Sequence, residues 1–189
     1  MRPSASCRRF WFTFIVWFTV MSMKYAKWAA IAVCLGIFVV FAPLWFGKRS
    51  LTDQERQLAI SMFAEGLNLD PIKIREGGVL TWVYPAVTTG NTISFPTGAY
   101  DPNDRKDQAL LLHELAHVWQ FQHNGLGYVP RALYEEITQP DAYVVHYDPS
   151  KTFGEYDIEE QAEIVAEYFL TGNASYEPYL QEIRSAREK

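Results

Sequence analysis

The sequence predicts a small α+β domain attached to an N-terminal transmembrane helix. Three observations lead to this fold class: a charge-free run of twenty residues near the N-terminus, short strand-like segments between residues 71 and 98, and two helical stretches that carry His and Glu side chains. A length of 189 residues allows one ordinary domain and an appendage. The net charge of −5, with no basic cluster beyond residue 50, argues against nucleic acid as a partner.

The charge-free run extends from Trp28 to Gly47 and is flanked on both sides by basic residues. Its length matches the hydrocarbon core of a bilayer. The chain is therefore divided into an N-terminal segment (1–27), a membrane anchor (28–47) and a globular domain (50–189). Positive charge is in excess before the run, which keeps the N-terminus in the cytoplasm. We expect a single-pass protein of the bacterial inner membrane with a periplasmic domain.

Alternatives exist for this N-terminal region. The apolar stretch Phe10–Met23 is short for a span, and translation from Met23 would place a charged start directly before the long run. The stretch could also form a second span. The long run could be a signal peptide, but Ala42-Pro43-Leu44 does not fit the usual cleavage pattern, so we favour an uncleaved anchor. Both cysteines, Cys7 and Cys34, precede the globular domain, which therefore has no disulfide.

The globular domain is expected to begin with a helix. Thr52 and Glu55 form a capping box that opens a helix to about Leu67. Three short strands are predicted after it, over residues 72–75, 79–84 and 92–95, separated by glycine-containing turns. At the other end of the chain, residues 176–187 have the pattern of an amphipathic helix.

The predicted chemistry lies on a helix from Asp104 to about residue 123, which carries the pattern HExxH. His113 and His117 are four residues apart, so both rings lie on one helix face and can reach one metal ion. Glu114 follows the first of them and could act as general base on a metal-bound water. The surrounding residues are apolar on nearly all sides, which is typical of a buried helix.

A catalytic zinc ion requires a third protein ligand and an open position. The helix predicted over residues 157–170 offers Glu159 and Glu163 beside an apolar stripe. We favour Glu159 as the third ligand, with Glu163 accepting the second N–H of a ligand histidine; Glu163 is the alternative ligand. His123 has the third-ligand spacing of the pattern HExxHxxGxxH, but Gln120 replaces its glycine, and a continuing helix would carry His123 away from the metal.

Residues 125–156 are rich in Gly, Pro, Tyr and Asp, which predicts a long loop with a short helix over residues 131–137. Such a connection between two site-forming helices is often the wall or lid of a cleft. His146 and Tyr147 in this loop are candidate hydrogen-bond donors to the oxyanion of a hydrolytic reaction. Otherwise they are loop residues that pack on the domain.

The motif HELAH from His113, followed by Glu159-x-x-x-Glu163 on a later helix, resembles the gluzincin branch of the zincin metallopeptidases. Together with the segment from Tyr156 it is similar to small bacterial zincin-like proteins related to Vgr. The resemblance covers about residues 50–172. It implies a zincin-like fold, made of a small sheet, an active-site helix and a second Glu-bearing helix.

For the site, the resemblance implies zinc held by His113, His117 and Glu159, with Glu114 as base; gluzincins usually have Asp at the position of Glu163. It also implies a sheet edge that binds an extended peptide beside the site, for which residues 92–95 are the candidate.

The expected function is hydrolysis of a peptide bond by a membrane-anchored zinc metallopeptidase, with Zn²⁺ as cofactor and a peptide or protein as substrate. Glu114 favours catalysis, because a purely structural metal site needs no base. The alternative is a non-catalytic zincin-like domain that binds or assembles with a bacterial envelope or secretion system. A membrane adaptor with a metal-free motif is a further possibility.

Overall fold

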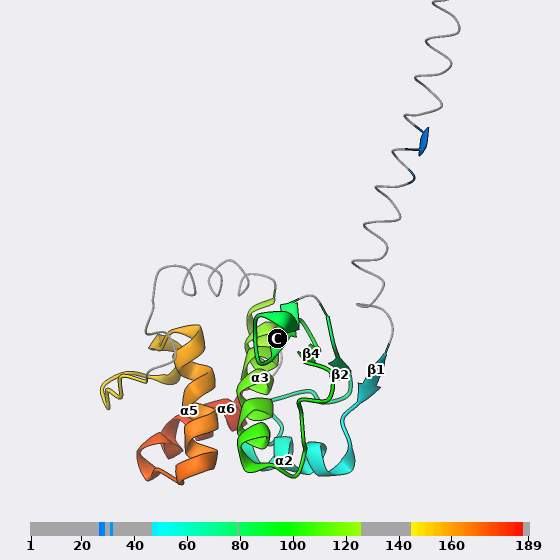
Figure 1. Cartoon of the computed structure of the whole chain (residues 1–189). Helices are drawn as coiled ribbons and strands as arrows, with labels where there is room; N and C mark the ends of the chain where they lie inside the picture. The colour runs from blue at the N-terminus through cyan, green and yellow to red at the C-terminus, as the bar shows by residue number, and fades with distance from the viewer. Residues whose placement is uncertain (1–26, 29–30, 32–46, 79, 126–144, 187–189) are drawn as a thin grey trace, which may run out of the picture. The chain divides into compact units, whose positions relative to one another are not determined.

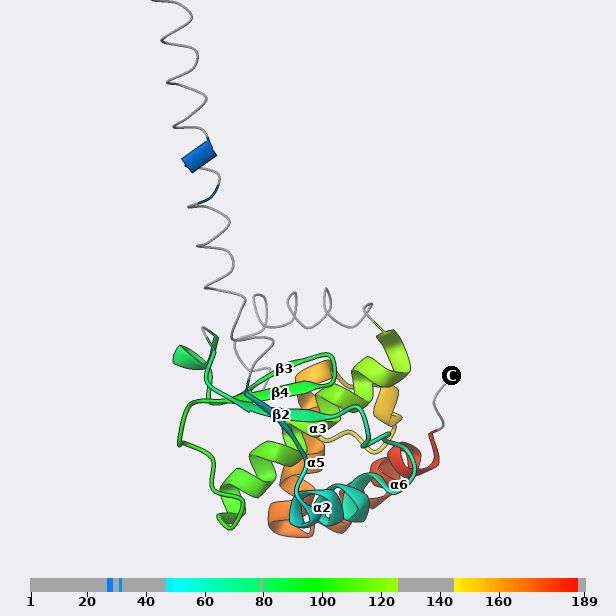
Figure 2. The ribbon, with the colours of Figure 1, turned by 90° about the vertical axis from the view of Figure 1, so that its right-hand side faces the viewer.

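A short sheet, a central helix and a second layer of helices make up the domain (Figure 1). The computed structural model describes residues 27–28, 31, 47–78, 80–125 and 145–186. Within the unit that begins at Gly47, the helix α3 (Arg105–Asn124) lies between the sheet and the helices α5 (Ile158–Thr171) and α6 (Glu177–Ser185). Figure 2 shows the sheet with α3 and α5 behind it.

The sheet has four strands in the order β1-β2-β4-β3 among the described residues. They are β1 (Lys48–Ser50), β2 (Lys73–Glu76), β3 (Val87–Thr89) and β4 (Thr92–Phe95). The β3–β4 hairpin turns at Gly90, and β4 then pairs in parallel with β2. This pairing places β4 inside the sheet, so the expectation that residues 92–95 form its edge is wrong. The strand β3 forms that edge instead.

The strand predicted over residues 79–84 is also wrong. Leu80–Trp82 forms a 3₁₀ turn, and the side chains of Trp82 and Val83 are 85% and 77% exposed. Positive φ angles at Gly77 and Gly78 turn the chain out of the sheet. Pro85 lacks the N–H that a strand would use, and strand structure resumes only at Val87.

The first predicted helix is confirmed as α2 (Asp53–Phe63), including the capping box of Thr52 and Glu55. It ends four residues before the predicted limit. The backbone leaves the helical conformation at Ala64, whose φ is 49°. Gly66 then packs close to α6, where an added Cβ would lie 2.0 Å from the carbonyl oxygen of Ile183.

The two site-bearing helices form where the sequence predicts them. Asp104 caps α3 by accepting hydrogen bonds from the backbone N–H groups of Lys106 and Asp107. The helix α5 begins at a capping box of Asp157 and Glu160 and ends at Gly172, whose φ of 66° is left-handed. The C-terminal helix is confirmed as α6; a 3₁₀ turn at Ala174–Tyr176 precedes its first residue, and residue 187 of the predicted range lies outside the described residues.

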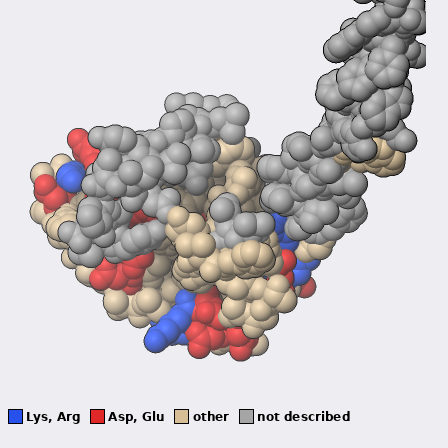
Figure 3. Space-filling view, turned by 45° about the horizontal axis from the view of Figure 1, so that its top comes forward, with Lys and Arg blue, Asp and Glu red and all other residues tan. Residues whose placement is uncertain are grey.

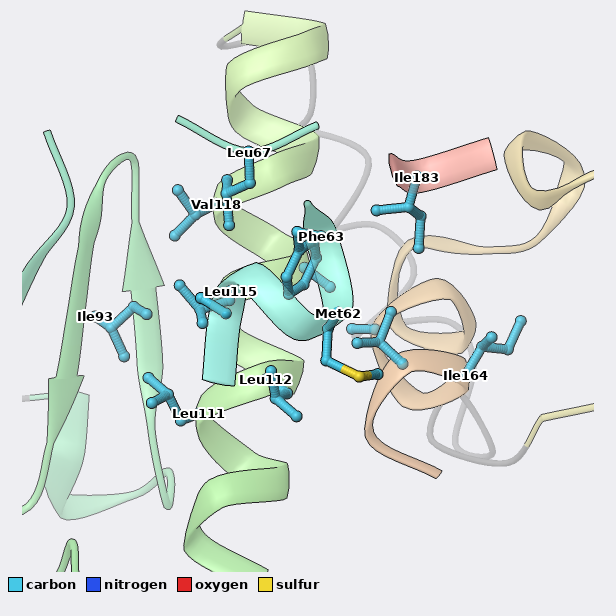
Figure 4. Packing of buried hydrophobic residues seen from close by; sticks show 14 of the residues in the cluster. Met62, Phe63, Leu67, Ile93, Leu111, Leu112, Leu115, Val118, Ile164 and Ile183 are labelled. Atoms are coloured by element: carbon cyan, nitrogen blue, oxygen red, sulfur yellow. The ribbon is translucent and has the colours of Figure 1, made fainter. Parts of the chain in front are cut away.

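The core is built on both sides of α3. Figure 4 shows Leu111, Leu115 and Val118 of α3 on the side of Ile93, which belongs to the sheet. Leu112 lies on the other side, toward Met62 of α2 and Ile164 of α5. A helix covered from two sides needs apolar residues around most of its circumference, which explains the composition of this segment.

The predicted membrane anchor over residues 28–47 lies almost entirely outside the described residues, as does the helix predicted over residues 131–137. Among the residues that the structure describes, no helix has the length and apolarity needed to cross a bilayer.

Charges on the surface are mixed. On the face shown in Figure 3, acidic side chains form several groups, and basic side chains lie singly or in small groups near them. Within the described part of this face there is no continuous basic area.

Candidate metal centre

Three side chains from α3 and α5 converge on one point. His113 and His117 are one helical turn apart on α3, and Glu159 approaches them from the first turn of α5. The two Nε2 atoms are 3.2 Å apart, and Oε2 of Glu159 lies 3.3 Å from the first and 3.4 Å from the second. Both histidines are buried, and the Glu159 side chain is 13% exposed.

The geometry of these three atoms fits a zinc ion. Donor atoms about 2.0–2.1 Å from a tetrahedral zinc ion are separated by about 3.3–3.4 Å. The three observed separations, from 3.2 to 3.4 Å, match this spacing without any movement of the side chains. Two imidazoles and one carboxylate are also a donor set that zinc prefers.

The second nitrogen of each ring has its own acceptor. Nδ1 of His113 lies 3.4 Å from Oε2 of Glu163, and Nδ1 of His117 lies 2.8 Å from Oε1 of Gln120. Both acceptors are oxygen atoms, so the Nδ1 atoms carry the hydrogens and the Nε2 atoms of neutral rings direct lone pairs toward Glu159. Three electron-pair donors this close repel one another unless a cation or a proton lies between them.

The same crowding changes the acid–base properties of the cluster. Burial disfavours the charged form of His113, but hydrogen bonds to Glu159 and Glu163 and the charge of Glu114 outweigh burial and raise its pKa to about 10. Burial alone would raise the pKa of Glu159, but the neighbouring rings of His113 and His117 lower it far below the usual range of a carboxyl. The cluster therefore attracts positive charge.

Glu114 lies beside the three converging donors and not among them. Its side chain is buried, and its Oε2 atom accepts a hydrogen bond of 2.6 Å from the hydroxyl of Thr88 on β3. The same hydroxyl is 3.2 Å from the carbonyl oxygen of Glu114. The edge strand thus holds this carboxylate in place.

The cluster opens into a cavity of about 740 Å³. His113, Glu114, His117 and Glu159 all line it. The rest of the wall is mainly apolar and comes from the segment before β3, from α3 and from α5: Tyr84, Pro85, Ala109, Leu110, Ala166 and Leu170. A ligand in this cavity would contact the carboxylate of Glu114 and the three converging donor atoms together.

The structure does not bring His146 and Tyr147 to this cavity. The side chain of His146 is 73% exposed and lies 3.4 Å from Oε1 of the buried Glu160. Tyr147 packs against the rings of Tyr176 and Tyr179. His123 is also remote from the cluster, because α3 continues as a helix and its ring stacks on Trp119.

Two polar residues of the site do not follow from the HExxH pattern: Thr88 and Gln120. Nothing in the sequence near Thr88 distinguishes it from other strand threonines. Gln120 does have a signal, because it follows His117 by three residues and therefore lies on the same helix face.

Comparisons with known proteins identify relatives for most of the described domain. The eCIS core domain matches residues 83–125, a segment that contains β3, β4 and α3. The type VI secretion system spike protein VgrG2b of Pseudomonas aeruginosa is 29% identical over 161 residues, which are 77% of this chain and 16% of that protein. The chain therefore spans a small part of this relative's length.

A solved structure of the same relative is also similar to this chain. The effector domain of Pseudomonas aeruginosa VgrG2b superposes with a TM-score of 0.57 and 28% sequence identity. The match covers 82% of this chain and 94% of that domain.

These findings correct three expectations. The family match is to the eCIS core domain and the VgrG2b effector domain, in place of the gluzincin metallopeptidases. The fold class is accordingly a small α+β domain that resembles this effector domain. The expected location as a single-pass inner-membrane protein is also wrong, because the relative is a spike protein of a type VI secretion system. In sequence and in fold, this chain is similar to the effector domain of a type VI secretion spike protein.

Proposed function

We propose that the chain is an effector-type component of a bacterial secretion system and that its domain binds a zinc ion through His113, His117 and Glu159. The similarity to the VgrG2b effector domain supports the first part. The observation that carries the second part is the triangle of donor atoms, whose sides of 3.2–3.4 Å suit one tetrahedral ion. Its partners would then include spike components of the secretion machinery.

Glu114 favours a second, catalytic function for the same site. A carboxylate that lines the cavity next to three metal-binding donors, without belonging to them, has the placement of a general base. A structural zinc site is closed by four protein ligands, whereas the described residues supply three. We therefore propose metal-assisted hydrolysis of an amide bond in a peptide or protein.

In this reaction the chain's own residues do the following. His113, His117 and Glu159 would hold zinc, which when bound would supply the Lewis acidity that makes water a nucleophile near neutral pH. Glu114 accepts a proton from the attacking water as the carbon–oxygen bond forms, and it passes the proton to the leaving nitrogen as the carbon–nitrogen bond breaks. Thr88 keeps the carboxylate oriented through its 2.6 Å hydrogen bond.

The test is zinc content and peptide cleavage of the full-length chain, compared with Glu114→Gln. We expect about one zinc ion per chain in both proteins, because Glu114 is not a ligand, and cleavage of a random peptide library only by the wild type. A folded wild-type protein that takes up no zinc after dialysis against it would overturn the metal site. Equal cleavage by Glu114→Gln would overturn the hydrolytic function and leave a metal-binding component.

The secretion part is tested separately. Release of the tagged chain from a host with a working contractile secretion machinery should stop when that machinery's sheath is deleted. Equal release from both strains would contradict the proposal, whatever the metal content.

A further inference from the structure

We infer that Gln120 is a positioning residue that holds His117 in its metal-binding tautomer. Because Gln120 also bonds to the start of α5, this tautomer depends on the packing of α5 against α3. The inference rests on the metal site proposed above and adds a determinant of its affinity. Gln120 lies on α3 one turn after His117 and is 1% exposed. Its whole amide is used in hydrogen bonds inside the domain.

The direction of these hydrogen bonds is determined by Ile158. The amide nitrogen of Gln120 is 2.8 Å from the backbone carbonyl oxygen of Ile158, which can only accept. This end of the Gln120 amide must therefore be the NH₂ group, and its oxygen must face Nδ1 of His117 at 2.8 Å. An amide oxygen only accepts, so His117 carries its proton on Nδ1.

A second glutamine extends the arrangement. The NH₂ group of Gln120 also donates to Oε1 of Gln161 at 3.0 Å, and the NH₂ group of Gln161 donates to the carbonyl oxygen of Tyr156 at 3.0 Å. The carbonyls of Tyr156 and Ile158, at the start of α5, thus orient both amides. We call Gln120 and Gln161 the amide relay.

The relay and the metal ligands share the same junction between helices. Gln161 and Glu159 lie on the first turn of α5, while Gln120 and His117 lie on one face of α3. When α5 docks, it brings the third ligand to the cluster and, through the relay, keeps Nε2 of His117 without a proton. Loss of a partner that orients a metal-ligating histidine typically weakens metal affinity by about 10–100-fold.

The two ligand histidines are oriented by different chemistry. His113 faces the carboxylate of Glu163, which is 34% exposed, whereas His117 faces a buried neutral amide. Gln120→Glu would put another negative charge near Glu159. It would also remove the NH₂ group that donates to the carbonyl of Ile158. An amide orients the ring without adding charge.

The experiment compares Gln120→Met, Gln120→Glu and a matched control, Gln122→Met, in the full-length chain. Met has a shape similar to Gln and no hydrogen bond, while Glu keeps an acceptor for His117. Gln122 lies on the same helix and makes three hydrogen bonds to Asn68 and Asn91, away from the cluster. Long-range ¹H–¹⁵N NMR reads the tautomer of the neutral His117 ring in metal-free protein, and competition with a chelator reads zinc affinity.

We expect the Nδ1–H tautomer of His117 in the wild type, in Gln122→Met and in Gln120→Glu, and a mixture of tautomers in Gln120→Met. Zinc affinity should fall by about 10–100-fold in Gln120→Met and stay unchanged in Gln122→Met. Gln120→Glu should be less stable to urea than the wild type, while His117 keeps its Nδ1–H tautomer. A residue with a merely structural role would not change stability and tautomer independently.

An unchanged tautomer and unchanged affinity in Gln120→Met would overturn the inference while leaving the metal site intact. If Gln120→Met does not fold, Gln120→Ala replaces it, because this change also removes both the acceptor of His117 and the donor to the carbonyl of Ile158, and the same tautomer and affinity changes are expected. A wild type that binds no zinc would overturn the proposed metal site instead, and the tautomer in metal-free protein would still test the relay.

Discussion

Glu55 and Glu159 are both largely buried carboxylates, and the domain surrounds them in two different ways. Glu55 is 1% exposed and receives two hydrogen bonds of 2.7 Å from the guanidinium of Arg49, and another of 2.7 Å from the backbone N–H of Thr52. Glu159 instead faces the Nε2 atoms of two histidines at 3.3 and 3.4 Å. Glu55 is paired with a guanidinium that carries a permanent positive charge. Glu159 instead meets two imidazole nitrogens that also offer electron pairs.

The difference separates stability from binding. The pair of Glu55 and Arg49 connects β1 to the start of α2 and is complete without any ligand. The cluster of His113, His117 and Glu159 is completed only by a proton or a metal cation. Disrupting the first should therefore lower the free energy of unfolding, and disrupting the second should lower affinity for metal.

The largest effect is expected for Glu159→Gln. Loss of a direct ligand should weaken zinc binding by more than the roughly 100-fold that marks the upper range for outer partners. Chelator competition measures this loss, and Glu55→Gln serves as the control with wild-type affinity. Wild-type zinc affinity in Glu159→Gln would remove Glu159 from the ligand set.

Glu55→Gln should reverse this pattern. Removing one partner of a buried ion pair costs about 3–5 kcal/mol, and we expect about 2–3 kcal/mol here because the Arg49 side chain is 42% exposed and regains water. Urea unfolding of metal-free protein gives the difference. A loss below about 0.5 kcal/mol, the usual range for surface substitutions, would mean that the two carboxylates do not differ in this way.

A smaller effect is expected for Glu163→Ala, which removes the oxygen 3.4 Å from Nδ1 of His113. Zinc affinity should fall by about tenfold, the lower end of the range for such partners, because this carboxylate is one-third exposed. Glu167→Ala removes the same charge four residues further along α5 and should leave affinity unchanged. Similar losses in both variants would point to a general charge effect.

The smallest effect concerns acid. Burial alone would raise the pKa of Glu55, but hydrogen bonds from Arg49 and Thr52 lower it below its usual value in the folded protein. The unfolded chain therefore binds a proton at Glu55 more readily than the folded protein does. The stabilisation from ionised Glu55 is fully present above the ordinary pKa of a glutamate, about 4.3. It is lost as the pH falls through the lower pKa of Glu55 in the folded protein. In urea titrations, the stability difference between wild type and Glu55→Gln should shrink below about pH 4. A stability difference between the two proteins that stays constant down to pH 3 would contradict the lowered pKa of Glu55.

The sequence alone predicted the features that depend on short-range geometry. The capping box of Thr52 and Glu55 predicted where α2 begins, and the helices predicted over residues 104–123 and 157–170 form as α3 and α5, within a few residues of those limits. The four-residue spacing of His113 and His117 predicted that their rings meet. These features follow from the pitch of a helix, which is the same in any fold.

Only the tertiary structure decided the rest. The approach of Glu159, the direction of the amide relay and the hydrogen bond of Thr88 all depend on how α5 and β3 pack against α3. The position of β3 at the sheet edge, with β4 inside, depends on strands paired across a long stretch of sequence. Contacts of this kind reflect the free energy of the whole packed domain, and no local pattern of residues determines it.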